Sequence, residues 1–234
     1  MKPVYIVSWL FALAISFVSC DDWLDKTPKD RLYPDVYFKT EDELRLFTNQ
    51  FYNNLVPSAV DIYSESSDLI VKSDLMLEMS GQRIIPDEGN GWNFTALRDI
   101  NFYLQYSHNC TEVNARNRYD GVARFFRAYF YFEKVKRYGD IPWYDKALDS
   151  DDPELYKARD SREFVMQKML EDLDFAIANL PKTKNAYVLT RWTALALKSR
   201  VCLFEGTFRK YHTEFNLPDA DKFLKEAVNA SEEL

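Results

Sequence analysis

Hydrophobic residues recur at three- and four-residue spacing along most of the chain, a pattern that predicts amphipathic helices. A first helix is expected over residues 41–56, and it begins at a capping box because Thr40 precedes Glu43 by three residues. Its apolar face carries Leu44, Phe47, Phe51 and Leu55. The same spacing and its start and stop signals predict five further helices, over residues 95–107, 119–138, 161–180, 190–210 and 219–234.

The helix expected over 119–138 is unusually aromatic, with six rings in the eight residues from Phe125 to Phe132. Three interpretations are open: a packed interior, a platform that stacks on sugars, and a helix that lies on a membrane. On a helical wheel the rings occupy several arcs, which favours burial among neighbouring helices. Phe126, Tyr129 and Phe130 are therefore expected in the core. The sequence Gly139-Asp140-Ile141-Pro142 ends this helix.

Two stretches lack helical periodicity, residues 57–92 and the acidic segment 145–160. Residues 57–92 are the longest irregular stretch, and long loops are where binding residues tend to lie. The remaining helices come in pairs joined by short turns, as in helical-repeat proteins. When the helix around Ala123 is aligned with the helix around Ala196, three positions match. The offset of 73 residues is close to the length of two 34-residue tetratricopeptide repeats plus a short insertion. The three matches pair Ala123 with Ala196, Arg127 with Arg200 and Phe130 with Leu203. The predicted fold is all-α, a tetratricopeptide-like layer with long irregular loops.

The N-terminus differs from the rest of the chain. After Lys2, residues 4–18 form an apolar run of fifteen, shorter than the roughly 20 residues of a membrane-spanning helix. This predicts a signal peptide over residues 1–19. The run ends at Cys20, which resembles the lipidated cysteine of bacterial lipoproteins, and acyl chains there would anchor the protein. The alternative is a cysteine that merely follows a cleaved peptide. Residues 20–40 are expected to form a tether.

Charge and residue types exclude several functions. The net charge of −7 argues against nucleic-acid binding. Cys110 and Cys202 lie far apart without a C-x-x-C motif, so they are either isolated buried thiols or a disulfide. The two histidines form neither H-E-x-x-H nor an evident Ser-His-Asp arrangement, and no pair among the many carboxylates stands out. No enzyme activity, cofactor or metal is expected.

Five stretches together resemble one family. The sequence ARFFRAYFYFEKVKRYGDIPW is similar to the signature helix of the SusD/RagB family, the outer-membrane nutrient-binding lipoproteins of Bacteroidetes. The other four, in order, are SCDDWLDKTP, WNFTALRDINFYL, EDLDFAIANLP and TRWTALALKSRVCLFEG. The resemblance covers residues 18–210, and family members are typically about twice as long as this chain. It implies that residues 41–234 are an N-terminal helical domain truncated at its C-terminus.

The resemblance also implies a function. Family members are anchored by lipid at the cell surface of the outer membrane, where they cap a TonB-dependent transporter of the SusC type. They bind oligosaccharides, or in some cases peptides, and deliver them to the transporter. Acidic residues directly after Cys20 resemble the surface-export signal of such lipoproteins. The alternative is a tetratricopeptide-like protein–protein adaptor, or a peptide-binding lipoprotein, without glycan binding.

Sugar recognition needs flat rings and hydrogen-bonding groups. Side chains of these types in and beside the 57–92 loop are Arg83, Asp87, Trp92 and Asn93. Trp92 has a second interpretation, as a residue that only packs against the start of the following helix. Asn101 is expected to be a buried hydrogen-bonding residue rather than a ligand contact, and Trp143 is expected to pack in the interior.

Overall fold

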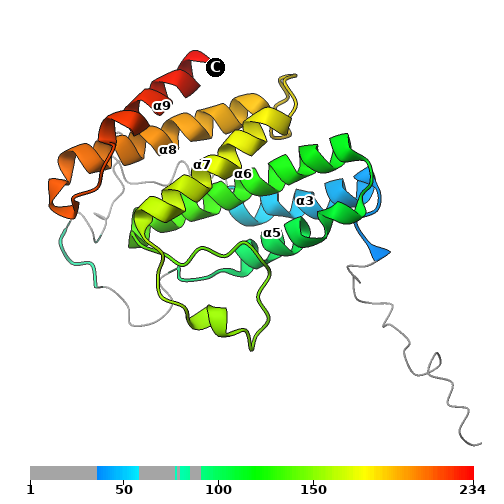
Figure 1. The fold of residues 1–234 in the computed structure, drawn as a ribbon, viewed down its shortest axis with the longest axis horizontal. Coiled ribbons are helices and arrows are strands. Elements are labelled where there is room, and N and C mark those ends of the chain that lie inside the picture. Colours follow the sequence, from blue (N-terminus) through cyan, green and yellow to red (C-terminus); the bar gives the residue numbers. More distant parts are fainter. Residues whose placement is uncertain (1–35, 58–76, 78–79, 85–90) are drawn as a thin grey trace, which may run out of the picture. The chain divides into compact units, whose positions relative to one another are not determined.

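Six α-helices make up most of the part of the chain that the computed structural model describes, residues 36–57, 77, 80–84 and 91–234 (Figure 1). They are α3 (Glu41–Leu55), α5 (Thr95–Tyr106), α6 (Val113–Tyr138), α7 (Arg162–Asn179), α8 (Arg191–Tyr211) and α9 (Ala220–Glu232). Three short 3-10 helices are η2 (Ser107–Asn109), η3 (Pro153–Tyr156) and η4 (Thr213–Phe215). Within these ranges no strand forms, so the all-α prediction is confirmed.

Local sequence signals set most helix ends. The capping box at Thr40 is present, because the Glu43 N–H donates to Thr40 Oγ1 (3.3 Å) and the Thr40 N–H donates to Glu43 Oε2 (3.0 Å). Gly139 ends α6 with φ +70°, a conformation that a residue with a Cβ adopts only under strain. The predicted start of α6 is wrong: the helix begins at Val113 rather than 119. Its first turns are almost entirely polar, so they carry no apolar periodicity.

Consecutive helices run antiparallel and pack side by side (Figure 1). The long helix α6 contacts α3 and α5 as well as α7, and α8 lies between α7 and α9. This arrangement of helix pairs agrees with the predicted repeat layer. The 73-residue alignment does not, because it matches buried Ala123, Arg127 and Phe130 to exposed positions. Ala196, Arg200 and Leu203 all lie on the solvent side of α8, so that offset compares opposite helix faces.

Five of the six clustered rings of α6 are buried, namely Phe125, Phe126, Phe130, Tyr131 and Phe132. Phe126 packs edge-on against Phe51 (centroids 6.0 Å apart) and Tyr52 (5.0 Å) of α3. The rings are therefore interior packing between helices, as their distribution around the wheel predicts. Tyr129 is the exception: it packs against the core but is only half-buried and also lines a surface pocket, so its assignment to the core is only partly correct.

Both cysteines in the described ranges, Cys110 and Cys202, are buried free thiols. The disulfide alternative is thus excluded. Burial raises the pKa of Cys202 to about 12, and the nearby Lys198 ammonium opposes this shift only in part. A thiol that stays protonated at neutral pH is a packing residue and a poor nucleophile.

A buried arginine connects three helices with the loop that follows α6. Arg127 donates from Nε (2.6 Å) and Nη2 (2.8 Å) to the two carboxylate oxygens of Asp172 in α7. Its Nη1 donates to Oδ1 of Asn101 in α5 (3.2 Å). Burial alone would lower the pKa of Arg127, but the hydrogen bonds and charge of Asp172 raise it. The guanidinium therefore stays charged inside the protein.

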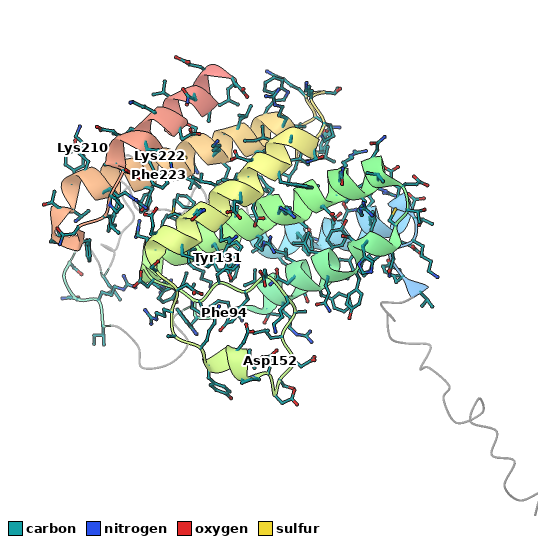
Figure 2. All side chains as sticks on the ribbon, in the orientation of Figure 1. Phe94, Tyr131, Asp152, Lys210, Lys222 and Phe223 are labelled. Atoms are coloured by element: carbon teal, nitrogen blue, oxygen red, sulfur yellow. The ribbon has the colours of Figure 1, made fainter. Side chains whose placement is uncertain are left out.

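Asn101 extends this connection to the backbone of the loop. Its Nδ2 donates to the carbonyls of Tyr144 (2.8 Å) and Lys146 (3.2 Å), and only 1% of the residue is exposed. The prediction that Asn101 is a buried hydrogen-bonding residue is confirmed. Trp143 is also buried, stacked on Tyr131 with ring centroids 4.2 Å apart, as predicted. The Tyr131 hydroxyl, labelled in Figure 2, accepts the Tyr144 N–H (2.7 Å).

The loop from Gly139 to Ser161 is closed at its base by an antiparallel bridge between Ile141 and Asp160. Asp160 Oδ2 also accepts the Trp143 N–H at 2.7 Å. No helix of the described residues is both long enough and apolar enough to cross a membrane.

Substitution of Phe126 by alanine should strongly destabilise the fold. The residue is 1% exposed and contacts two rings of α3, so its removal leaves a cavity between helices. We expect a loss of roughly 3–5 kcal/mol in the free energy of unfolding, measured by urea denaturation. Tyr187→Ala is the control: that ring is 91% exposed, and the change should stay within about 0.5 kcal/mol. Equal stability of the two variants would contradict the assignment of Phe126 to the core.

Asp172→Asn should cost roughly 3–5 kcal/mol of unfolding free energy, because it leaves the buried Arg127 guanidinium without a countercharge. Replacing both partners, as in Arg127→Met/Asp172→Leu, should cost less than the sum of the single changes, which a double-mutant cycle measures. Asp174→Asn is a matched control on the same helix. This exposed carboxylate pairs with Lys198, and after the substitution Lys198 still has its second ion-pair partner, Glu226. Additive losses at Arg127 and Asp172 would argue against their coupling.

Candidate functional site

A pocket of about 530 Å³ lies between the start of α5 and the loop after α6. Phe94, labelled in Figure 2, is the lining residue just before α5, and Tyr144 and Lys157 are among the lining residues of the loop. The lining combines aromatic rings, an amide and several cations: Trp92, Phe94, Thr95, Leu97, Arg98, Asn101, Pro142, Tyr144, Lys146, Leu148, Leu155, Lys157, Ala158 and Arg159.

The α5 side of the pocket is fixed by the start of that helix. Asn93 Oδ1 accepts the Thr95 N–H at 2.8 Å, an Asx-type turn that orients the first helical residues. Trp92 precedes it, and its ring contacts Phe94 (centroids 5.2 Å apart) and Tyr138 (4.9 Å) edge-on. Trp92 is nevertheless 41% exposed. Trp92 thus packs against the helix start and also borders the pocket, and its contact with a ligand stays a prediction.

The opposite wall is the loop. Its Tyr144 hydroxyl lies 3.2 Å from the Glu154 carbonyl, to which it donates, so the ring is held at both ends. Burial raises the pKa of Tyr144, and the charges of Asp160 and Glu154 raise it further. The hydroxyl therefore stays neutral at physiological pH. The Lys157 ammonium lies over the face of this ring, 5.0 Å from its centroid, and donates to the Trp143 carbonyl at 2.6 Å.

The predicted site residues have different positions in the structure. Trp92 borders the pocket, whereas Asn93 beside it uses its side-chain oxygen to start α5 and faces a neighbouring pocket. Arg83 is exposed and is not among the residues that line the pocket. Asp87 lies outside the described residues.

Sequence reasoning missed the loop side of the pocket, above all Tyr144, Lys157 and Arg159. Tyr144 lies just before the acidic segment 145–160 and the other two lie within it, and that segment was interpreted only as a loop. One signal pointed to them: an aromatic and several basic residues occur within a stretch dominated by Asp and Glu. Their proximity to α5 could not be inferred, because it depends on the hydrogen bonds of Asn101 to residues more than 40 positions away.

The neighbouring pocket, of about 600 Å³, is less suited to a ring-shaped ligand. Tyr129 contributes an aromatic ring, but Asp99, Glu133 and Lys134 make the wall largely ionic. Burial raises the pKa of Asp99 and, together with the charge of Arg137, lowers that of Lys134. The Lys134 ammonium donates to the Gly91 carbonyl.

The pocket beside Trp92 is equipped for binding. Rings and N–H donors converge on it, the combination that holds polar ring-shaped ligands in other proteins. Across the described ranges, no three histidine, cysteine, aspartate or glutamate side chains gather in a way that could hold a metal ion.

Solved structures with the same fold come from Bacteroides. A SusD-like protein from Bacteroides fragilis NCTC 9343 superimposes with a TM-score of 0.58 at 24% identity, over 89% of this chain and 40% of that protein. B. fragilis NanU gives a TM-score of 0.61 at 20% identity, over 87% of this chain and 44% of NanU. These similarities show the fold.

Curated relatives come from Formosa agariphila. SusD-like protein P38 is 24% identical over 91% of this chain and 45% of its own length. SusD-like protein P2 is 27% identical over 85% of this chain and 43% of its own length. The chain thus spans less than half the length of these two relatives.

Residues 51–191, well over half of the chain, match the family model SusD-like_2, described as starch-binding and associating with the outer membrane. This range contains α5, α6, α7 and both walls of the pocket. The sequence stretches, the fold and this match agree, and the chain belongs to the SusD-like family.

Proposed function

We propose that the chain is part of a cell-surface lipoprotein that binds glycans and delivers oligosaccharides to a TonB-dependent transporter of the SusC type. The observation that carries this proposal is the match of residues 51–191 to a family described as starch-binding and associating with the outer membrane. In this proposal the protein binds its ligand and passes it on without chemical change, so it is not an enzyme.

The pocket beside Trp92 is the proposed glycan site. A pyranose ring presents apolar C–H faces and equatorial hydroxyls, which call for an aromatic surface and hydrogen-bonding groups at its rim. Trp92 supplies exposed aromatic surface on the α5 side. Arg98 supplies N–H donors to the same pocket. Both walls are held by hydrogen bonds within the protein, so binding there costs little ordering.

Transporter binding is assigned to the helical layer, which offers long exposed helix faces away from the pocket. The second candidate function, a tetratricopeptide-like adaptor that binds only proteins, or a peptide-binding lipoprotein, is favoured by the same helix pairs. The two functions differ in whether saccharides bind.

Glycan binding is tested by affinity electrophoresis and isothermal titration calorimetry on the full-length protein with starch and a panel of other polysaccharides. We expect retardation by at least one glycan, and Trp92→Ala should weaken that binding by about tenfold or more, ~1.4 kcal/mol. Trp192→Ala, at the start of α8, is the matched control because its indole donates to the Lys182 carbonyl outside the pocket. Co-purification of a protein partner without any glycan binding would support the adaptor instead.

Anchoring is proposed to occur through acyl chains on Cys20, which lies outside the described residues. Cys20→Ala should release the protein from the outer-membrane fraction into the soluble fraction, since the remaining helices supply no membrane-spanning segment in the described ranges. Fractionation followed by immunoblotting measures this. A variant that stays in the membrane fraction like the wild type would show that Cys20 is not the anchor.

A further inference from the structure

The charge of the pocket is opposite to that of the chain. Four of its described lining residues are basic and none is acidic, whereas the whole chain has a net charge of −7. The basic residues are Arg98, Lys146, Lys157 and Arg159. A concave surface with one sign of charge focuses the electrostatic field and raises the local concentration of oppositely charged ligands.

Two of these cations are neutralised by the protein itself. Lys146 forms ion pairs with Asp152 (3.5 Å) and Glu154 (3.3 Å). Lys157 pairs with Asp160 at 3.0 Å and also donates to a backbone carbonyl. Both lysines serve mainly to hold the loop in shape.

The two arginines are not neutralised. Arg98 uses only Nε, which donates to the Leu148 carbonyl at 3.2 Å, and its terminal nitrogens have no acceptor among the described residues. Arg159 has neither an ion pair nor a hydrogen bond to any described residue, and its guanidinium lies 4.9 Å from the ring centroid of Trp92. Among the described lining residues, the positive charge that is not held in an ion pair therefore resides on Arg98 and Arg159.

The contact with Trp92 prepares Arg159 for an anion. A guanidinium held against an indole by the cation–π interaction loses rotamer freedom before any ligand arrives. Its N–H donors point outward in the plane of the group, in the fork that matches a carboxylate or a sulfate. Arg159 is also placed by its neighbours, because Asp160 forms the bridge with Ile141 and Ser161 caps α7.

We propose that the glycan bound beside Trp92 is acidic, with a carboxylate or sulfate group that Arg159 binds and Arg98 attracts. This inference rests on the proposed function, namely that the pocket binds a glycan. Trp92 then acts partly through Arg159, as the surface that fixes the guanidinium, while the part of its ring that stays exposed is left for the sugar.

The test compares saccharides that differ only in charge, using calorimetry on the full-length protein. One pair is oligogalacturonate and its fully methyl-esterified form, a second is a sulfated galactan oligosaccharide and its desulfated form, and starch oligosaccharides serve as an unrelated neutral ligand. We expect one acidic form to bind about tenfold tighter or more than its neutral partner. The affinity for that form should fall as NaCl is raised. Which pair responds distinguishes a carboxylate from a sulfate.

Arg159→Gln should reduce this preference to within about threefold, mainly by weakening binding of the acidic form, because the charge-assisted contact is removed. Arg118→Gln is the matched control: its guanidinium also lies near an aromatic ring, 5.2 Å from the centroid of Tyr119, and it pairs with Glu41, outside the pocket. Thermal denaturation followed by circular dichroism should show equal folding of both variants.

The outcomes separate the inference from the proposed function. Binding of starch or of neutral forms at least as tightly as acidic ones overturns the acidic ligand and leaves glycan binding intact. A preference for acid that survives in Arg159→Gln overturns the role of Arg159. Failure of every saccharide to bind overturns both the inference and the proposed function.

Discussion

The fold depends on one buried charge, the guanidinium of Arg127. A charge removed from water must be paired and hydrogen-bonded, so its partners cannot move independently. Arg127 in α6 meets this need with both carboxylate oxygens of Asp172 in α7 and with the amide of Asn101 in α5. Apolar faces alone would allow these helices to slide, whereas the paired charge fixes their register. The other end of Asn101 holds the loop backbone, so the same constraint places one wall of the pocket.

A second buried cluster of arginines and a carboxylate connects the later helices α7 and α8. Arg162 at the start of α7 donates from Nη2 to Glu205 of α8 at 2.7 Å, and Arg209 donates to the same carboxylate at 2.8 Å. Arg209 also reaches the Pro218 carbonyl, just before α9. The helix layer is thus joined by two sets of arginine–carboxylate contacts, one on each side of α7. Aromatic rings cover both sets: Arg127 lies 5.2 Å from the Trp143 ring and Arg162 lies 3.9 Å from that of Phe208.

Local patterns in the sequence predicted the helices because a helix is specified by its own residues. Apolar spacing and the cap at Thr40 located α3, while the polar first turns hid the start of α6. The buried ion pair could not be predicted, since Arg127 and Asp172 are 45 positions apart and each alone resembles a surface residue. The candidate site likewise contains one residue that the sequence indicated and one that it did not. Trp92 was found from its place before a helix, whereas Arg159 joins it only through tertiary contacts.

The residues that position the pocket walls differ from those that present charge to a proposed ligand. The walls of the pocket are positioned by groups other than its two exposed arginines: Asn93 at the start of α5, Tyr131 and Asn101 beneath the loop, and the bridge at Asp160. The side chains of Arg98 and Arg159, in contrast, are exposed and contribute little to packing. Substitutions at these two positions can therefore alter the charge presented to a ligand at small cost in stability. In the proposed function, specificity for a nutrient and stability of the helical layer are thus carried by separate residues that meet at the same pocket.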